Sequence, residues 1–156
     1  MADSDAHTGF GALLLKGDGA SPENFIAIMG VKSINGMSIS RATHDTTDMQ
    51  SPNGWREFVG GLVDGGEVSF EANFLPRNAT QNQEEGGFMA EFDKSSCDSR
   101  GNWRIQFPEC DGEAEGYFEF AGVATGQQVQ FPLDDLMGFS GTIKVSGRPE
   151  LVIASL

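Results

Sequence analysis

The chain contains little cysteine and little histidine. Its 156 residues include two cysteines, Cys97 and Cys110, and two histidines, His7 and His44. A secreted disulfide scaffold of this length normally carries more cysteines, so we expect two free thiols. The cysteine spacing does not match a zinc ribbon, and two histidines add too few ligands for a four-ligand metal site. The sequence therefore predicts no metal and no cofactor.

Basic residues are also scarce, since 10 Lys and Arg stand against 23 Asp and Glu, a net charge of -13. Binding to nucleic acid depends on clustered Lys and Arg that displace counterions from the phosphates. The acidic balance argues against tight binding of DNA or RNA. It suits an ordinary solvated surface and equally a channel that repels DNA.

Long hydrophobic runs are missing as well. No apolar run approaches the roughly 20 residues that a membrane-spanning helix needs. The first ten residues lack the cationic and apolar stretches of a signal peptide. We therefore expect one soluble domain, made in the cytoplasm, without a membrane partner and large enough to bury its own core.

Motifs for catalysis are incomplete. Gly138-Phe139-Ser140-Gly141 misses the spacing of a nucleophile elbow by one residue. The glycines of residues 9–11 and 17–19 lack the further glycine and lysine of a phosphate-binding loop. The 23 acidic residues offer so many carboxylate pairs that no pair stands out as a glycosidase acid and base. The sequence predicts a protein that is not an enzyme.

The first half of the chain is rich in glycine and polar residues. Residues 1–24 surround a short apolar patch with Gly, Ser and Asp, which is typical of a flexible N-terminal arm. A single β domain is expected over residues 25–156. Within it, Asn35-Gly36 predicts a hairpin turn between strands over 25–31 and 37–47. Residues 48–66 carry Pro52 and five glycines and predict a long loop.

The second half alternates apolar and polar residues as half-buried strands do. In residues 67–74 one face is apolar (Val68, Phe70, Ala72, Phe74) and the other is polar (Ser69, Glu71, Asn73). Further strands are predicted over 103–107, 117–124, 128–131 and 139–145, with a last apolar segment at 151–154. Thr80 and Gln83 resemble a capping box, and Phe88 with Phe92 complete a predicted helix over about 80–94, which Gly86-Gly87 weaken. The pattern predicts a mainly β fold, a sandwich or barrel with one flanking α-helix.

Several segments, in order, resemble the major tail tube proteins of lambda-like siphophages. They are residues 44–48 (HDTTD), 54–58 (GWREF) and 60–69 (GGLVDGGEVS). The resemblance continues through residues 81–92, 102–105, 121–123 and 144–149, and so covers about residues 25–150. It implies a tail-tube fold, similar to the secreted ring protein of type VI secretion.

In that family the subunits form hexameric rings that stack into a tube, whose lumen conducts DNA during ejection. The resemblance implies these partners: further copies of the chain, a tape-measure protein, and tail terminator and tip proteins. DNA would pass through without specific binding. The protein would belong to the virion tail and be assembled in the host cytoplasm.

The resemblance also implies where assembly residues lie. Two neighbouring hairpins would line the lumen, and the arm and the 48–66 loop would bind the adjacent ring. We therefore expect lumen-facing residues at Ser38, Ser40, Ser69, Glu71 and Asn73. We expect ring contacts at Asp48, Trp55, Arg56 and Phe58. From the residues alone, Trp55 is either an intersubunit anchor or the centre of a local loop core.

Two alternatives from other classes stay open. The first is a secreted or virion-surface β-sandwich module that binds carbohydrate, with Trp55 or Trp103 stacking on sugar rings. The second is a polysaccharide-degrading enzyme. Neither needs to form rings, so self-assembly separates both from the tube interpretation.

Overall fold

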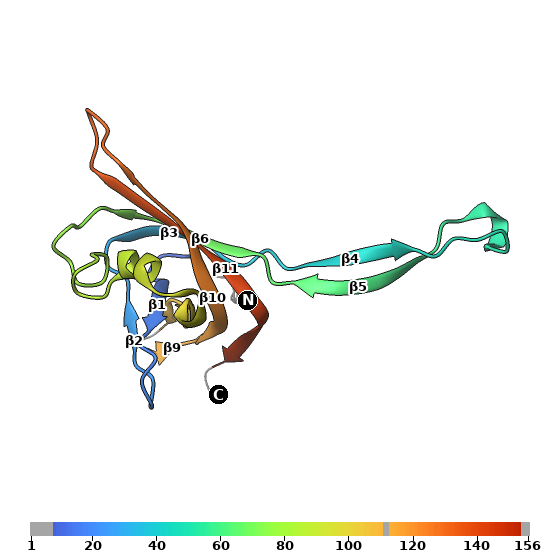
Figure 1. The fold of residues 1–156 in the computed structure, drawn as a ribbon, viewed down its shortest axis with the longest axis horizontal. Coiled ribbons are helices and arrows are strands. Elements are labelled where there is room, and N and C mark those ends of the chain that lie inside the picture. The colour runs from blue at the N-terminus through green and yellow to red at the C-terminus, as the bar shows by residue number, and fades with distance from the viewer. Residues whose placement is uncertain (1–7, 111–112, 154–156) are drawn as a thin grey trace, which may run out of the picture.

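A computed structural model describes residues 8–110 and 113–153, which form a curled β-sheet body and one long projecting hairpin (Figure 1). The body sheet has seven strands in the order β2-β1-β7-β10-β11-β6-β3, and neighbouring strands are antiparallel. Its strands are β1 (Leu13–Gly17), β2 (Phe25–Ala27), β3 (Val31–Asn35), β6 (Glu67–Asn73), β7 (Arg100–Gln106), β10 (Gly116–Gln130) and β11 (Gly138–Ile153).

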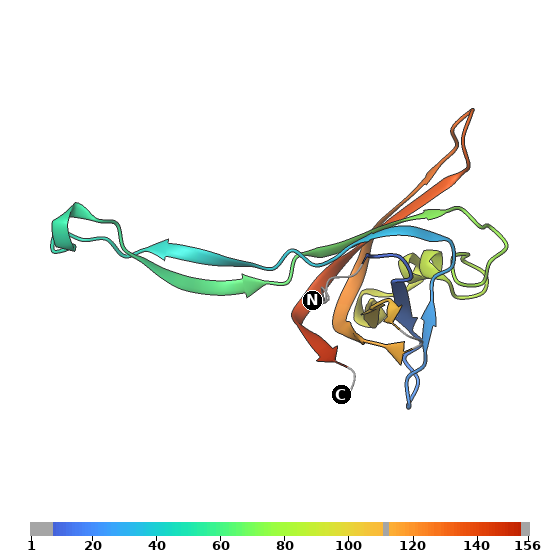
Figure 2. The same cartoon turned by 180° about the vertical axis from the view of Figure 1, so that it is seen from behind.

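The remaining elements lie outside this sheet. The projecting hairpin pairs β4 (Ser40–Asp45) with β5 (Phe58–Asp64), and the short helix η1 (Pro52–Gly54) lies near its tip. Two 3-10 helices, η2 (Phe88–Asp93) and η3 (Ser96–Asp98), precede β7. A small pair, β8 (Glu109–Cys110) and β9 (Glu113–Ala114), follows it. Figure 2 shows from behind that the hairpin extends well away from the body.

The core lies inside the curl of the sheet, where β1 also contacts β3. The apolar face predicted for residues 67–74 is confirmed, because Val68, Phe70 and Ala72 are buried. The inward faces of β7 and β11 likewise follow the predicted alternation. Phe88 of η2 closes the core, since its ring lies 5.0 Å from Phe70, 5.8 Å from Phe139 and 5.9 Å from Trp103.

The arm predicted over residues 1–24 is wrong in its second half. Leu13–Gly17 forms β1 between β2 and β7, and Leu14 is fully buried. The apolar signal is weak because the strand has only five residues and Gly and Asp flank it. Its burial depends on strands that are distant in sequence. Residues 1–7 lie outside the described residues.

The hairpin turn predicted at Asn35-Gly36 is also wrong. β3 pairs with β6, with Ile34 opposite Phe70, whereas β4 pairs with β5. Part of the predicted loop at 48–66 is therefore the strand β5. No apolar alternation marks β4 or β5, because no residue of either strand is buried.

The helix predicted over about 80–94 is shorter and of another type, since only the six residues of η2 are helical, as a 3-10 helix. The Thr80 hydroxyl does not cap it and instead accepts the Met29 N–H at 3.0 Å. Among the residues that the structure covers, the flanking α-helix is thus replaced by short 3-10 helices. The predicted strands at 117–124 and 128–131 are one strand, β10, with a register shift beside Thr125.

Candidate assembly surfaces

A polar face covers the outside of four neighbouring strands, β10, β11, β6 and β3. One row across these strands joins Ser33, Glu71, Ser140 and Gln128 through direct register pairs. The next row joins Asn35, Ser69 and Thr142, and the Asn35 amide donates to the Ser69 hydroxyl at 3.2 Å. These positions alternate with buried apolar residues on the same strands, so they point away from the core.

The predicted positions Ser69, Glu71 and Asn73 all lie on this polar face. Glu71 is exposed, and its carboxylate forms no ion pair or hydrogen bond with the described residues. Ser38 and Ser40 do not belong to the face, because the chain leaves the body after β3. Ser40 pairs with Asp64 at the base of the projecting hairpin. The lumen role of these two serines stays a prediction.

Two strand edges flank the polar face. β3 is the terminal strand of the body sheet. On the other side, β7 pairs with β10 only as far as Val123, so residues 125–130 of β10 pair with β11 alone. Each edge presents backbone N–H and C=O groups without a strand partner in this chain, and such an edge is a template for pairing with another strand.

The projecting hairpin holds the predicted contact residues together near its tip. Trp55 is 74% exposed and Phe58 is 58% exposed, so the interpretation of Trp55 as a local loop core is wrong. Backbone hydrogen bonds keep the tip in shape, with Thr46 N–H donating to the Glu57 carbonyl at 2.8 Å. Thr47 donates hydrogen bonds to Asp45, which lower the pKa of that carboxyl. The tip is therefore an ordered surface with an unburied indole.

The base of the hairpin is fixed to the body by Asp64. Its carboxylate accepts the Gly66 N–H at 2.8 Å and pairs with the Lys144 ammonium at 2.9 Å. The Gly66 N–H and then Lys144 lower the pKa of Asp64. Gly66 has a φ of 75°, and a side chain there would collide with the backbone of Ser38. This joint sets the direction in which the hairpin leaves the sheet.

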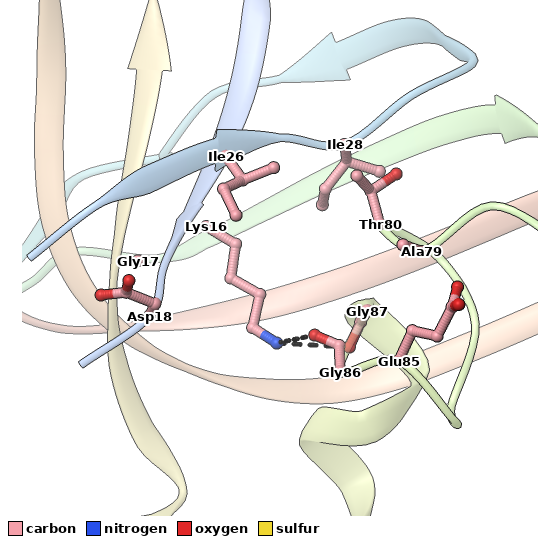
Figure 3. Close-up of a pocket in the computed structure, with 10 residues that line it drawn as sticks. All are labelled: Lys16, Gly17, Asp18, Ile26, Ile28, Ala79, Thr80, Glu85, Gly86 and Gly87. Carbon is pink, nitrogen blue, oxygen red and sulfur yellow. Dashed lines mark hydrogen bonds between the residues drawn. The ribbon is translucent and has the colours of Figure 1, made fainter. Parts of the chain in front are cut away.

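A small pocket between β1, β2 and the segment before η2 is lined by Lys16 (Figure 3). The Lys16 ammonium donates to the carbonyls of Gly86 and Gly87 at 2.9 and 3.2 Å. It also pairs with the buried Glu91 at 2.6 Å, and Lys94 reaches the same carboxylate at 2.9 Å. These contacts tie the segment before η2 to β1. The pocket beside them is small, with a volume of about 150 Å³.

Sequence reasoning did not identify these buried polar groups. Gln81 is fully buried, donates to the carbonyls of Met29 and Asn73, and accepts the Leu75 N–H. The capping-box pattern at Thr80 to Gln83 and the family resemblance over 81–92 do not indicate that Gln81 and Glu91 are buried, so only the fold reveals this. The described residues contain no cluster of three metal-ligating side chains and no helix long and apolar enough to cross a membrane.

Comparison with solved structures places the fold among proteins of phage-like tails and injection systems. A chain from the C6-symmetric tail of an empty GTA particle is 18% identical, with a TM-score of 0.70 over 94% of this chain and 99% of that chain. A chain from the sheath/tube terminator of the PVC extracellular contractile injection system is 13% identical, with a TM-score of 0.71 over 97% and 99%. The fold is therefore that of tail tube subunits. No curated protein matches the sequence significantly.

The family model described as lambda phage tail tube protein, TTP, matches residues 14–152. The chain belongs to this family, as the motifs at 44–69 indicate. It is a structural subunit of a tail tube and a component of the virion tail, not an enzyme. The carbohydrate-binding and polysaccharide-degrading alternatives are thereby set aside.

Proposed function

We propose that six copies of the chain form a ring, that rings stack into the tail tube, and that DNA passes through the lumen. The polar face flanked by two strand edges supports this proposal. Pairing the β3 edge of one copy with residues 125–130 of the next would continue the four-strand layer around a ring and leave no edge open. The six-fold symmetry of the GTA tail, whose chain has the same fold, supports the number six.

The polar face would then line the lumen. Its central residues carry hydroxyl, amide and carboxylate groups (Ser33, Ser69, Glu71, Asn73, Gln128, Ser140). Lys144 follows Ser140 and Thr142 on the same face of β11, but its ammonium is paired with Asp64. The surface is therefore a poor cationic binding site for DNA, and repeated Glu71 carboxylates repel phosphates within about 8 Å at physiological salt. DNA would therefore slide past without specific binding.

The tip of the projecting hairpin, with Asp48, Trp55, Arg56 and Phe58, would bind the adjacent ring. Further partners would be a tape-measure protein and tail terminator and tip proteins, with assembly in the host cytoplasm. Solved chains of this fold come from tails, baseplates and tube terminators, which supports assembly alongside other tail proteins.

Electron microscopy of the purified chain at high concentration tests ring and tube formation. Six-fold tubes support the proposal, and a chain that stays monomeric at all concentrations contradicts it. The lumen assignment is tested separately with Glu71→Lys in phage particles. We expect tails to form and DNA release to slow, because rings of ammonium groups bind phosphates.

The matched control is Glu84→Lys, which makes the same charge change on an exposed residue outside the polar face. DNA release at the wild-type rate through tails shown to contain Glu71→Lys contradicts the lumen role. If Glu71→Lys prevents tail formation while Glu84→Lys does not, Glu71 lies in a subunit contact instead.

A further inference from the structure

The turn between β10 and β11, residues 131–137, exposes an unusual amount of apolar surface. Leu133 is 97% exposed, Phe131 71% and Leu136 69%. The turn also carries two adjacent carboxylates. Among the described residues, the Asp134 carboxylate forms no ion pair or hydrogen bond, and the Asp135 carboxylate accepts only the Leu136 N–H at 2.7 Å. Exposed apolar residues next to unpaired charges are typical of a surface that binds another protein.

An apolar groove of about 850 Å³ runs along β3 to the point where the chain leads into the projecting hairpin. Its apolar lining includes Phe10, Leu13, Met37, Ile39, Phe107 and Phe118. Lys32 is the one charged residue that lines it, and this ammonium has no ion-pair partner within the described ranges. The groove therefore presents apolar surface with a free positive charge.

Two exposed apolar tips of the chain, the projecting hairpin and the 131–137 turn, are candidates to fill the groove. Their charges distinguish them. At the tip of the projecting hairpin, Asp45 already lies 3.8 Å from Arg56, and Glu57 accepts the Ser51 hydroxyl at 3.0 Å. Among the described residues, the Asp48 carboxylate at that tip accepts only the Gln50 N–H, but Arg56 brings a positive charge to the same tip. The 131–137 turn contains Asp134 and Asp135 and no basic residue, so it complements Lys32 better than the hairpin tip does.

The turn does not occupy the groove of its own chain, since none of residues 131–137 lines the groove and Leu133 is 97% exposed. A contact between two different patches of the same chain is heterologous, and such a contact can repeat from copy to copy along a stack of rings.

We propose that the 131–137 turn of one copy inserts Leu133 into the apolar groove of a second copy, with Asp134 and Asp135 beside Lys32. This contact would join successive rings next to the lumen strands, and it rests on the proposed tube. It is distinct from the contact of the projecting hairpin, because neither the turn nor the groove contains any hairpin tip residue.

Disulfide trapping tests the contact directly. Leu133→Cys and Ile39→Cys are combined in a background in which both native cysteines are replaced, Cys97→Ser with Cys110→Ser, and assembled tubes are treated with an added mild oxidant. Both positions are more than half exposed, so folding should tolerate the changes. We expect a ladder of covalent oligomers on a denaturing gel, absent from either single-cysteine control and from dilute monomer.

Wild-type protein is tested in parallel, so that failure of the turn contact is distinguished from failure of the proposed tube. Tubes of the double variant that give no ladder overturn the inserted turn while leaving the proposed tube intact. A wild-type chain that never forms tubes overturns the proposed function and this inference together.

Charge reversal gives a second test that does not depend on disulfides. Lys32→Glu and the double change Asp134→Lys with Asp135→Lys should each raise the concentration needed for assembly about tenfold. Combining them should restore assembly to within about threefold of wild type, because the pair is reversed and not removed. Glu84→Lys is the control for added positive charge. Additive losses in the combined variant contradict the pairing.

Discussion

The body and the projecting hairpin contain one tryptophan each, and the two residues show opposite environments. Trp103 is 1% exposed and donates its indole N–H to the Gly122 carbonyl at 3.3 Å, whereas Trp55 is 74% exposed. Five strands of the body, β1, β6, β7, β10 and β11, contain buried residues, while no residue of β4 or β5 is buried. The body is therefore folded by its own contacts, and the hairpin surface is available for contacts with other chains.

The largest expected effect comes from the buried tryptophan. Trp103→Ala should lower the free energy of unfolding by about 3–5 kcal/mol, because it leaves a cavity beside Phe88 in the core. Denaturant unfolding of dilute, unassembled protein measures it. Trp55→Ala is the matched control and should change this free energy by less than about 0.5 kcal/mol. Equal losses from both substitutions would contradict the division between body and hairpin.

The second prediction concerns assembly, for which Trp55 and not Trp103 is the critical tryptophan. Trp55→Ala should weaken polymerisation by about 2 kcal/mol or more, close to 30-fold in the concentration needed for tubes, as expected for a tryptophan buried at an interface. Sedimentation across a concentration series measures this threshold. Normal tubes from the folded variant would reject the hairpin tip as a ring contact.

A smaller effect is expected for the buried amide of the body. Gln81→Ala leaves the carbonyls of Met29 and Asn73 and the Leu75 N–H without their partner, and should cost about 1–3 kcal/mol of folding stability. Gln50→Ala, on the exposed hairpin tip, is the control and should be nearly neutral. Thermal unfolding compares the two. A neutral Gln81→Ala would mean that water replaces the amide.

The smallest effect is expected at the joint between the two regions. The pKa of Asp64 is lowered in the folded protein, so its contacts hold above the ordinary aspartate pKa of about 4 and are lost as the pH falls through the lowered value. Asp64→Asn at neutral pH should therefore speed amide exchange at the base of β5, with Glu84→Gln as the control. Unchanged exchange in residues 58–67 would show that Gly66 fixes the base of the hairpin without the Asp64 contacts.

The same division explains what could be predicted from the sequence. The alternation of Val68, Phe70 and Ala72 reports a half-buried strand, so the direction of Ser69, Glu71 and Asn73 away from the core followed correctly. The hairpin could not be found in this way, because strands exposed on both faces have no apolar alternation. The lumen and ring-contact roles of the predicted residues stay predictions.

Residues whose environment comes from distant segments were missed for another reason. Leu14 is buried by β7 and Ile28, and Gln81 bonds to the chain 52 residues earlier at Met29. Local propensity carries no information about such neighbours. The resemblance to tail tube proteins identified the family correctly because it relies on the order of short motifs, which does not require knowing how strands pair.

The long ladder between β10 and β11 has a mechanical consequence. Its strands of 15 and 16 residues pair from Gly116 with Ile153 to Gln130 with Gly138. Their hydrogen bonds run perpendicular to the strands, so a pull along the strand direction loads the bonds in shear and all of them resist together. A pull across the ribbon would break them one at a time. The body is thus stiffest along these strands, and a tube whose rings were linked at the two ends of this ladder would transmit tension through covalent chain and sheared bonds.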